Sequence, residues 1–133
     1  MSADGWDRLA AEIAGMVPSL ADGDTLIVRA RPYFVQMQQL PDHLQVEAIA
    51  DEFLPEDRRL TARDRQHMVE LGWRPPPEPE LGDNWECPFP WPLSSADAAR
   101  VGELFVRTLR EVHGATDPAG LVRESFNALG GRG

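Results

Sequence analysis

The sequence predicts one α+β domain over residues 1–133, with an antiparallel sheet that is covered by helices mainly on one face. Two observations predict this class. Residues 24–54 contain three runs in which apolar and polar side chains alternate, as in antiparallel strands with one face on a core. The segments before and after these runs repeat apolar residues every three or four positions, as amphipathic helices do. The expected element order is α-β-β-β-α-β-β-α.

The first half of the chain is expected to form a helix and a meander of three strands. The helix covers residues 2–17, and the strands cover residues 25–30, 33–40 and 44–50. The apolar stripe of the helix is formed by Trp6, Leu9, Ile13 and Met16. Proline and aspartate separate the strands, because proline cannot donate to a ladder and both residues favour turns.

The alternation gives the expected sheet two different faces. One face is consistently apolar: Leu26, Val28, Val35, Met37, Leu44 and Val46. The other mixes polar and apolar side chains: Ile27, Phe34, Gln36, Gln38, Gln45, Glu47 and Ile49. The apolar stripes of the helices account for only the first face. The mixed face is therefore the expected place for a function.

Three helical segments are expected in the second half. One covers residues 61–71 and ends at Gly72, a residue that suits the position after a helix. The clearest helix covers about residues 96–113. Asp117-Pro118 then has the order of a helix cap followed by a first helical residue, which predicts a short further helix. Its contacts with the domain are expected from Leu121, Val122 and Phe126. The tail, residues 129–133, is expected to fray.

A hairpin is expected between these helices. Trp73 begins a short fourth strand, a proline-rich loop covers about residues 75–83, and a fifth strand lies near residues 85–89. Pro88 and Pro90 restrict the fifth strand to an edge of the sheet, because proline has no N–H for the ladder.

Composition argues against several classes of protein. No apolar run approaches the roughly 20 residues that cross a bilayer, and the N-terminus lacks the segments of a signal peptide. The single cysteine, Cys87, excludes an internal disulfide and suits the cytoplasm. A net charge of −9 with scattered arginines argues against nucleic-acid binding. We therefore expect a cytoplasmic protein that binds neither nucleic acid nor membranes.

No convincing catalytic or metal-binding pattern occurs. The three histidines, His43, His67 and His113, form no close pair with each other or with the cysteine, so no metal site or cofactor is expected. The dipole at a helix C-terminus accounts for His113. Cys87 is interpreted as a small buried hydrophobe, because no nearby base would activate it.

An acid-dependent enzyme is the weakest hypothesis. If the third strand continues, Glu47 and Asp51 fall on one face about 13 Å apart. The paired carboxylates of glycosidases lie roughly 5–9.5 Å apart. The expected protein is therefore not an enzyme.

Several short segments together carry a family resemblance. They are residues 33–37, residues 46–54 (VEAIADEFL), Leu60-Thr61, residues 71–75 (LGWRP), Asn84-Trp85 and residues 104–114. From Trp6 to about Phe126 the chain resembles the actinobacterial TY-Chap family, peptide-binding chaperone-like domains related to type III secretion chaperones and YbjN proteins. The resemblance implies a type III secretion chaperone-like fold and a non-enzymatic role in holding a peptide or partner-protein segment.

The mixed sheet face is compatible with such a role, because peptides bind sheets by strand addition or through apolar anchors. The candidate binding residues are Ile27, Phe34, Gln36, Gln45, Glu47 and Ile49, with Trp73 and Trp85 if they face the same way. The alternative is a structural or assembly subunit whose sheet face is buried in a homodimer or a hetero-complex.

Overall fold

The computed structural model describes residues 2–78 and 81–129, and it confirms the α+β class. The helices are α1 (Ser2–Met16), α2 (Ala62–Leu71) and α3 (Ser95–Arg107). The strands are β1 (Asp24–Ala30), β2 (Tyr33–Gln39), β3 (His43–Ala48), β4 (Trp85–Pro90) and β5 (Val122–Asn127). The element order is therefore α-β-β-β-α-β-α-β, which differs from the expected order at its end.

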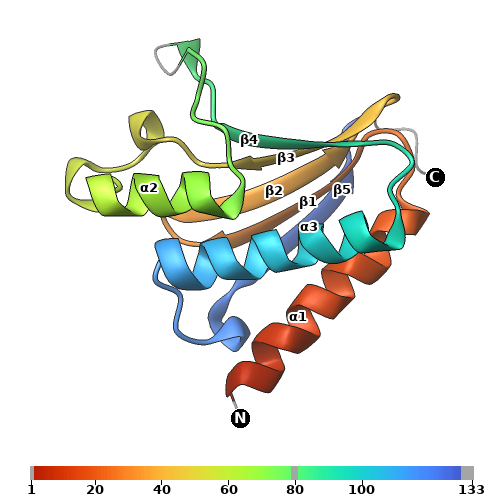
Figure 1. The fold of residues 1–133 in the computed structure, drawn as a ribbon, viewed down its shortest axis with the longest axis horizontal. Helices are drawn as coiled ribbons and strands as arrows, with labels where there is room; N and C mark the ends of the chain where they lie inside the picture. The colour runs from red at the N-terminus through yellow and green to blue at the C-terminus, as the bar shows by residue number, and fades with distance from the viewer. Residues whose placement is uncertain (1, 79–80, 130–133) are drawn as a thin grey trace.

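The strands form one antiparallel sheet in the spatial order β4-β3-β2-β1-β5. The three helices lie on the same face of this sheet, with α1 and α3 crossing each other (Figure 1). The inward side chains of the first three strands are buried as the alternation predicts, and they form the core with the apolar stripes of α1 and α3. None of the helices that the structure describes is long and apolar enough to cross a membrane.

The ends of α2 form as the sequence predicts. The Thr61 hydroxyl accepts a hydrogen bond from the Asp64 N–H, and the Asp64 carboxylate accepts one from the Thr61 N–H. This reciprocal pair satisfies donors at the start of the helix. Gly72 follows the helix at a φ of 113°, a conformation that glycine adopts readily.

The short helix expected at Asp117-Pro118 starts as predicted, with the Asp117 carboxylate accepting a hydrogen bond from the Ala119 N–H at 2.9 Å, but the prediction is wrong beyond the first turn. Pro118–Gly120 forms only a single 3₁₀ turn, and β5 follows it and pairs with β1. The four-residue spacing of Val122 and Phe126 fits a helix, but these residues also alternate with Arg123 and Ser125 in the period of a strand. The unpaired edge of β1 offers backbone partners to this segment, and the strand satisfies them.

The strand expected at Trp73 is also wrong. Only Arg74 pairs with β4, through an isolated bridge to Glu86. The prolines that follow Arg74 lack the N–H groups that a longer ladder needs. Apart from Leu129, the tail that was expected to fray lies outside the described residues, as do residues 79 and 80 of the expected loop.

Candidate functional site

The face of the sheet opposite the helices, called the outer face below, is built from alternate residues of all five strands. From β5 to β4 these are Val122, Glu124 and Phe126; Thr25, Ile27 and Arg29; Phe34, Gln36 and Gln38; His43, Gln45 and Glu47; Glu86, Pro88 and Pro90. Ile49 continues the alternation after β3, and its N–H donates to the Phe34 carbonyl. The structure therefore brings Ile27, Phe34, Gln36, Gln45, Glu47 and Ile49 to one face.

A polar ladder occupies the middle of the outer face. The Glu47 carboxylate accepts hydrogen bonds from the side-chain amides of Gln36 at 3.1 Å, Gln45 at 3.2 Å and Asn84 at 3.2 Å. His43 extends the ladder through a 3.1 Å contact between its Nε2 and Gln45. These mutual bonds hold the side chains in fixed positions, so the middle of the face presents a preorganised row of amides.

The apolar part of the outer face differs from the expected one. Ile27 and Phe34 are half-buried, whereas Ile49 is only 6% exposed and offers a partner little area. Val122 and Phe126 on β5 are 47% and 45% exposed and add apolar surface that the sequence reasoning assigned to a helix. Val122 and Phe126 share one parity of a strand, but their four-residue spacing fits a helix equally well, so the local pattern alone does not find them.

Trp73 and Trp85 do not belong to the outer face. Trp85 lies opposite Ala48 on the helix side of the sheet, because it shares the strand parity of the inward Phe89. Trp73 is buried beneath the helices, and its indole N–H donates to the Thr108 hydroxyl at 2.9 Å. Both tryptophans therefore build the core side of the sheet.

The β4 edge of the sheet is largely closed to further strands. The Arg74 bridge bonds both backbone groups of Glu86 on the side away from β3, at 2.8 and 3.1 Å. Backbone groups alternate in direction along a strand, so Pro88 and Pro90 also face this edge. Because proline has no N–H, that edge lacks the donors that an added strand requires.

The β5 edge has the opposite character. The Ala128 N–H donates to the Gly23 carbonyl at 2.8 Å, so even-numbered residues of this segment direct their backbone groups toward β1. The N–H and C=O groups of Arg123, Ser125 and Asn127 consequently point away from the sheet. Within the part of the chain that the structure describes, β5 ends the sheet, and it offers a regular row of donors and acceptors.

The premise of a Glu47–Asp51 pair does not hold. β3 ends at Ala48, and the chain turns so that the Asp51 carboxylate accepts bonds from the Leu60 N–H at 3.0 Å and from Arg65 at 3.3 Å. Asp51 thus holds the start of α2, whereas Glu47 belongs to the polar ladder. The described residues include no group of three or more side chains that could hold a metal ion.

His113 and Cys87 are both affected by burial. Burial lowers the pKa of His113 to about 3, so the ring is neutral near pH 7 and the expected role as a cation at the helix dipole is wrong. Burial also raises the pKa of the Cys87 thiol, which keeps it protonated and poorly nucleophilic.

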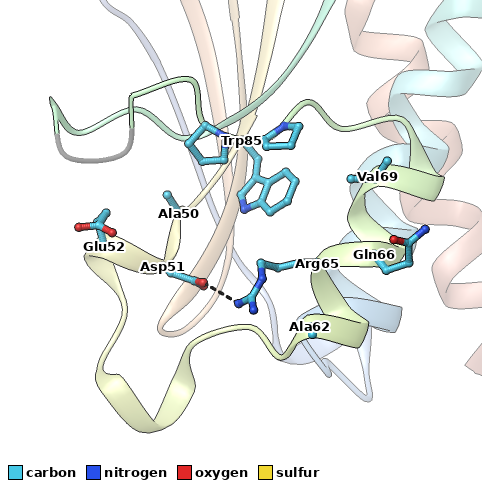
Figure 2. Close-up of a pocket in the computed structure, with 10 residues that line it drawn as sticks. Ala50, Asp51, Glu52, Ala62, Arg65, Gln66, Val69 and Trp85 are labelled. Carbon is cyan, nitrogen blue, oxygen red and sulfur yellow. Dashed lines mark hydrogen bonds and ion pairs between the residues drawn. The ribbon is translucent and has the colours of Figure 1, made fainter.

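A separate groove lies between α2 and the segment before β4 (Figure 2). We call it the Trp85 groove, and its volume is about 470 Å³. Its apolar walls are Ala50, Ala62, Val69, Pro75, Pro76 and Trp85. Asp51 and Arg65 form an ion pair at 3.3 Å across its end. The indole of Trp85 extends between the two sides of the groove, with its nitrogen edge toward this ion pair.

Comparison with known proteins gives one family. The family model described as TY-Chap3, T3SS (YopN, CesT) and YbjN peptide-binding chaperone 3, matches residues 2–127. No curated protein and no solved structure matches the chain. The matched range includes every helix and strand described above.

Proposed function

Since the chain belongs to the TY-Chap3 family of peptide-binding chaperones, we propose that it is a non-enzymatic chaperone-like module that holds an extended peptide or protein segment on its outer face and along β5. The observation that carries this proposal is the arrangement of the helices. All three lie on one face of the sheet, so no helix of the described residues covers the outer face, and β5 has no neighbouring strand on its far side among those residues (Figure 1).

Two kinds of contact support the proposal. The outward backbone groups of Arg123, Ser125 and Asn127 match the hydrogen-bonding pattern of an added strand, which gives affinity without demanding a sequence. The exposed side chains of Val122 and Phe126, with Phe34 further across the face, offer apolar anchors beside that edge. Together they favour extended segments that present apolar residues at alternate positions.

Hydrogen exchange with selected peptides tests where binding occurs. A display library of random peptides of about 12 residues presents extended segments without assuming a partner. We expect the selected peptides to slow exchange of the Ser125 and Asn127 amides. The Glu124 and Phe126 amides already face β1 and should change little. Protection confined to other parts of the chain would contradict strand addition at β5.

A double substitution tests the apolar anchors. Phe34→Thr with Phe126→Thr removes aromatic area from the outer face while keeping β propensity, and should weaken peptide binding at least about tenfold. The matched control is Phe53→Thr with Leu81→Thr, which removes exposed apolar side chains that lie outside that face. Ile49 is left intact because its burial would make a substitution damage the fold. Equal losses in both double variants would overturn the outer face as the site.

The alternative proposal is a structural or assembly subunit whose outer face is permanently covered by another chain. The half-buried Ile27 and Phe34 would then serve an interface. In that case the isolated chain should form a stable complex through the outer face, and library peptides should give no protection at β5.

A further inference from the structure

We propose that the Trp85 groove is a second binding place, separate from the outer face, and that it takes a neutral extended peptide segment through one backbone carbonyl and one small aliphatic side chain. The proposal rests on the proposed peptide-binding function only in taking a peptide as the ligand. The place where the ligand binds, its polarity and its size are inferred from the groove itself.

The indole N–H of Trp85 is the first observation. Trp85 is only 4% exposed, yet its N–H donates to none of the described residues. The nitrogen is also not among the sealed, unpartnered polar atoms of the described chain, so it remains open to the groove. The indole of Trp73 differs, since it donates to Thr108. A buried donor that faces a cavity is satisfied when a ligand supplies an acceptor.

The remaining polar groups of the groove make the ligand an acceptor. Asp51 uses one carboxylate oxygen for the Leu60 N–H and the other for Arg65. Arg65 makes its two bonds, to Asp51 and to the Leu60 carbonyl, through Nη1 alone. Its Nε and Nη2 donate to none of the described residues. The end of the groove near the indole therefore presents hydrogen-bond donors, whereas both oxygens of the Asp51 carboxylate already accept hydrogen bonds from the chain.

Charge favours a neutral acceptor over a carboxylate. The charged lining residues are Asp51, Glu52 and Arg65, which sum to one negative charge at neutral pH. Asp51 already neutralises the Arg65 guanidinium, and the whole chain carries a net charge of −9. A carboxylate ligand would therefore meet repulsion, while a peptide carbonyl would accept the same hydrogen bonds without it.

The apolar walls set the size of the side chain. Apart from Trp85, the apolar walls are small or compact residues, among them Ala50, Ala62 and Pro76, with Val69 at 48% exposure along α2. A volume of about 470 Å³ suits a few residues of peptide rather than a whole helix. Valine, alanine and proline fit such a surface and leave the adjacent carbonyl free to reach the indole.

NMR of the tryptophan side chains tests the proposal. The probe is the capped peptide acetyl-Ala-Val-Pro-Ala-amide, titrated to low millimolar concentration against the ¹⁵N-labelled chain. We expect the Trp85 indole proton to move downfield, as it does on gaining a hydrogen bond, while the Trp73 signal stays in place. No movement of the Trp85 signal would overturn the groove as a binding place. Tighter binding of the same peptide with a free C-terminal carboxylate would overturn the neutral-acceptor assignment.

Variants separate this site from the outer face. Trp85→Phe keeps an aromatic ring but removes the donor, and should weaken binding of the capped peptide about fivefold. Binding to this variant is followed through the backbone amide signals of Ala62 and Gln66, which line the groove. Val69→Gln changes an exposed wall residue without altering the core, and should weaken binding of the capped peptide by a similar factor. Unchanged binding in Val69→Gln would contradict the apolar contact. Phe34→Thr with Phe126→Thr should leave the titration with the capped peptide unchanged. The groove proposal can therefore hold or fail independently of the outer-face proposal.

Discussion

His113 is a titratable side chain in an apolar setting. Its ring stacks on Tyr33 with centroids 4.6 Å apart, and neither ring nitrogen has a hydrogen-bond partner among the described residues. Protonation of the folded chain would bury a charge without compensation, which is why the pKa falls to about 3 from 6.5. The unfolded chain, in contrast, takes up that proton as the pH drops below 6.5.

The free energy of unfolding should therefore depend on His113 in acid. Above pH 6.5 neither state binds the proton, so the stability is fully present, and between pH 6.5 and about 3 the unfolded state gains it. The loss is about 1.4 kcal/mol for each pH unit below 6.5, or about 2 kcal/mol at pH 5. Urea unfolding near pH 7 and pH 5 measures it, and His113→Phe should remove this contribution while preserving the stack on Tyr33.

His67 provides a control, because its pKa shift is opposite in direction to that of His113. A hydrogen bond to Glu111, at 2.6 Å, raises the pKa of His67. Its contribution to stability is present below the unfolded pKa and is lost as the pH rises through the folded pKa. His67→Gln should therefore leave the acid-induced loss in place or enlarge it slightly. If His67→Gln and His113→Phe flatten the acid dependence equally, burial of His113 is not its cause.

At the level of elements, the packing of α1 against α3 depends on one glycine. A Cβ on Gly102 would overlap the backbone carbonyl of Ala10 on α1. Because the overlap is with backbone rather than with a flexible side chain, it is relieved only if the two helices move apart. Gly102→Ala should therefore lower the free energy of unfolding by about 2 kcal/mol or more. Chemical denaturation of the variant measures this loss.

Gly15 is the matched control on α1. A Cβ there meets none of the described residues within 4 Å, and Gly15 lies within the helix. Gly15→Ala should stabilise the chain by about 0.5–1 kcal/mol, because alanine favours helix. Destabilisation by both alanines would indicate a general intolerance of substitution in α1 and α3 rather than a close helix crossing.

The sequence predicts elements best where their signals are local. The alternation in residues 24–48 fixes which side chains of the first three strands face inward, and the Thr61 cap marks the start of α2. β5 could not be recognised in the same way, because its partner β1 lies far away in sequence and its apolar residues fit two periods. The same reason hides the Trp85 groove, whose walls come from four separate stretches of the chain, at residues 50–52, 62–69, 75–76 and 85.

The sequence predicts only part of the candidate site, because some of its strands carry a local pattern and others depend on pairing with distant strands. The residues of β1, β2 and β3 were placed on one face by period-two alternation alone. The parity of Trp85 was open, because the start of β4 depends on pairing with β3 rather than on a local pattern. Val122 and Phe126 joined the outer face only once β5 was known.

At the scale of the whole molecule, the outer face has a composition that disfavours a permanent dimer. Stable homodimer interfaces are apolar at their centre and bury well over about 1,000 Å². Here the polar ladder of Gln36, Gln45 and Glu47 occupies the neighbouring strands β2 and β3, and the most exposed apolar side chains, Val122 and Phe126, lie on the β5 edge. Two copies would also bring together chains that each carry a net charge of −9.

We therefore expect the isolated chain to be monomeric at low concentration, with its outer face free to bind a partner. Light scattering after size exclusion should give a mass near 14.8 kDa at micromolar concentration, and raising the salt should increase self-association only weakly, through screening of the like charges. A mass near twice that value at every concentration, reduced by Phe34→Thr with Phe126→Thr but not by Phe53→Thr with Leu81→Thr, would contradict this expectation. That result would place a second copy on the outer face and favour the assembly subunit, because a face closed by a tight dimer leaves no room for a peptide.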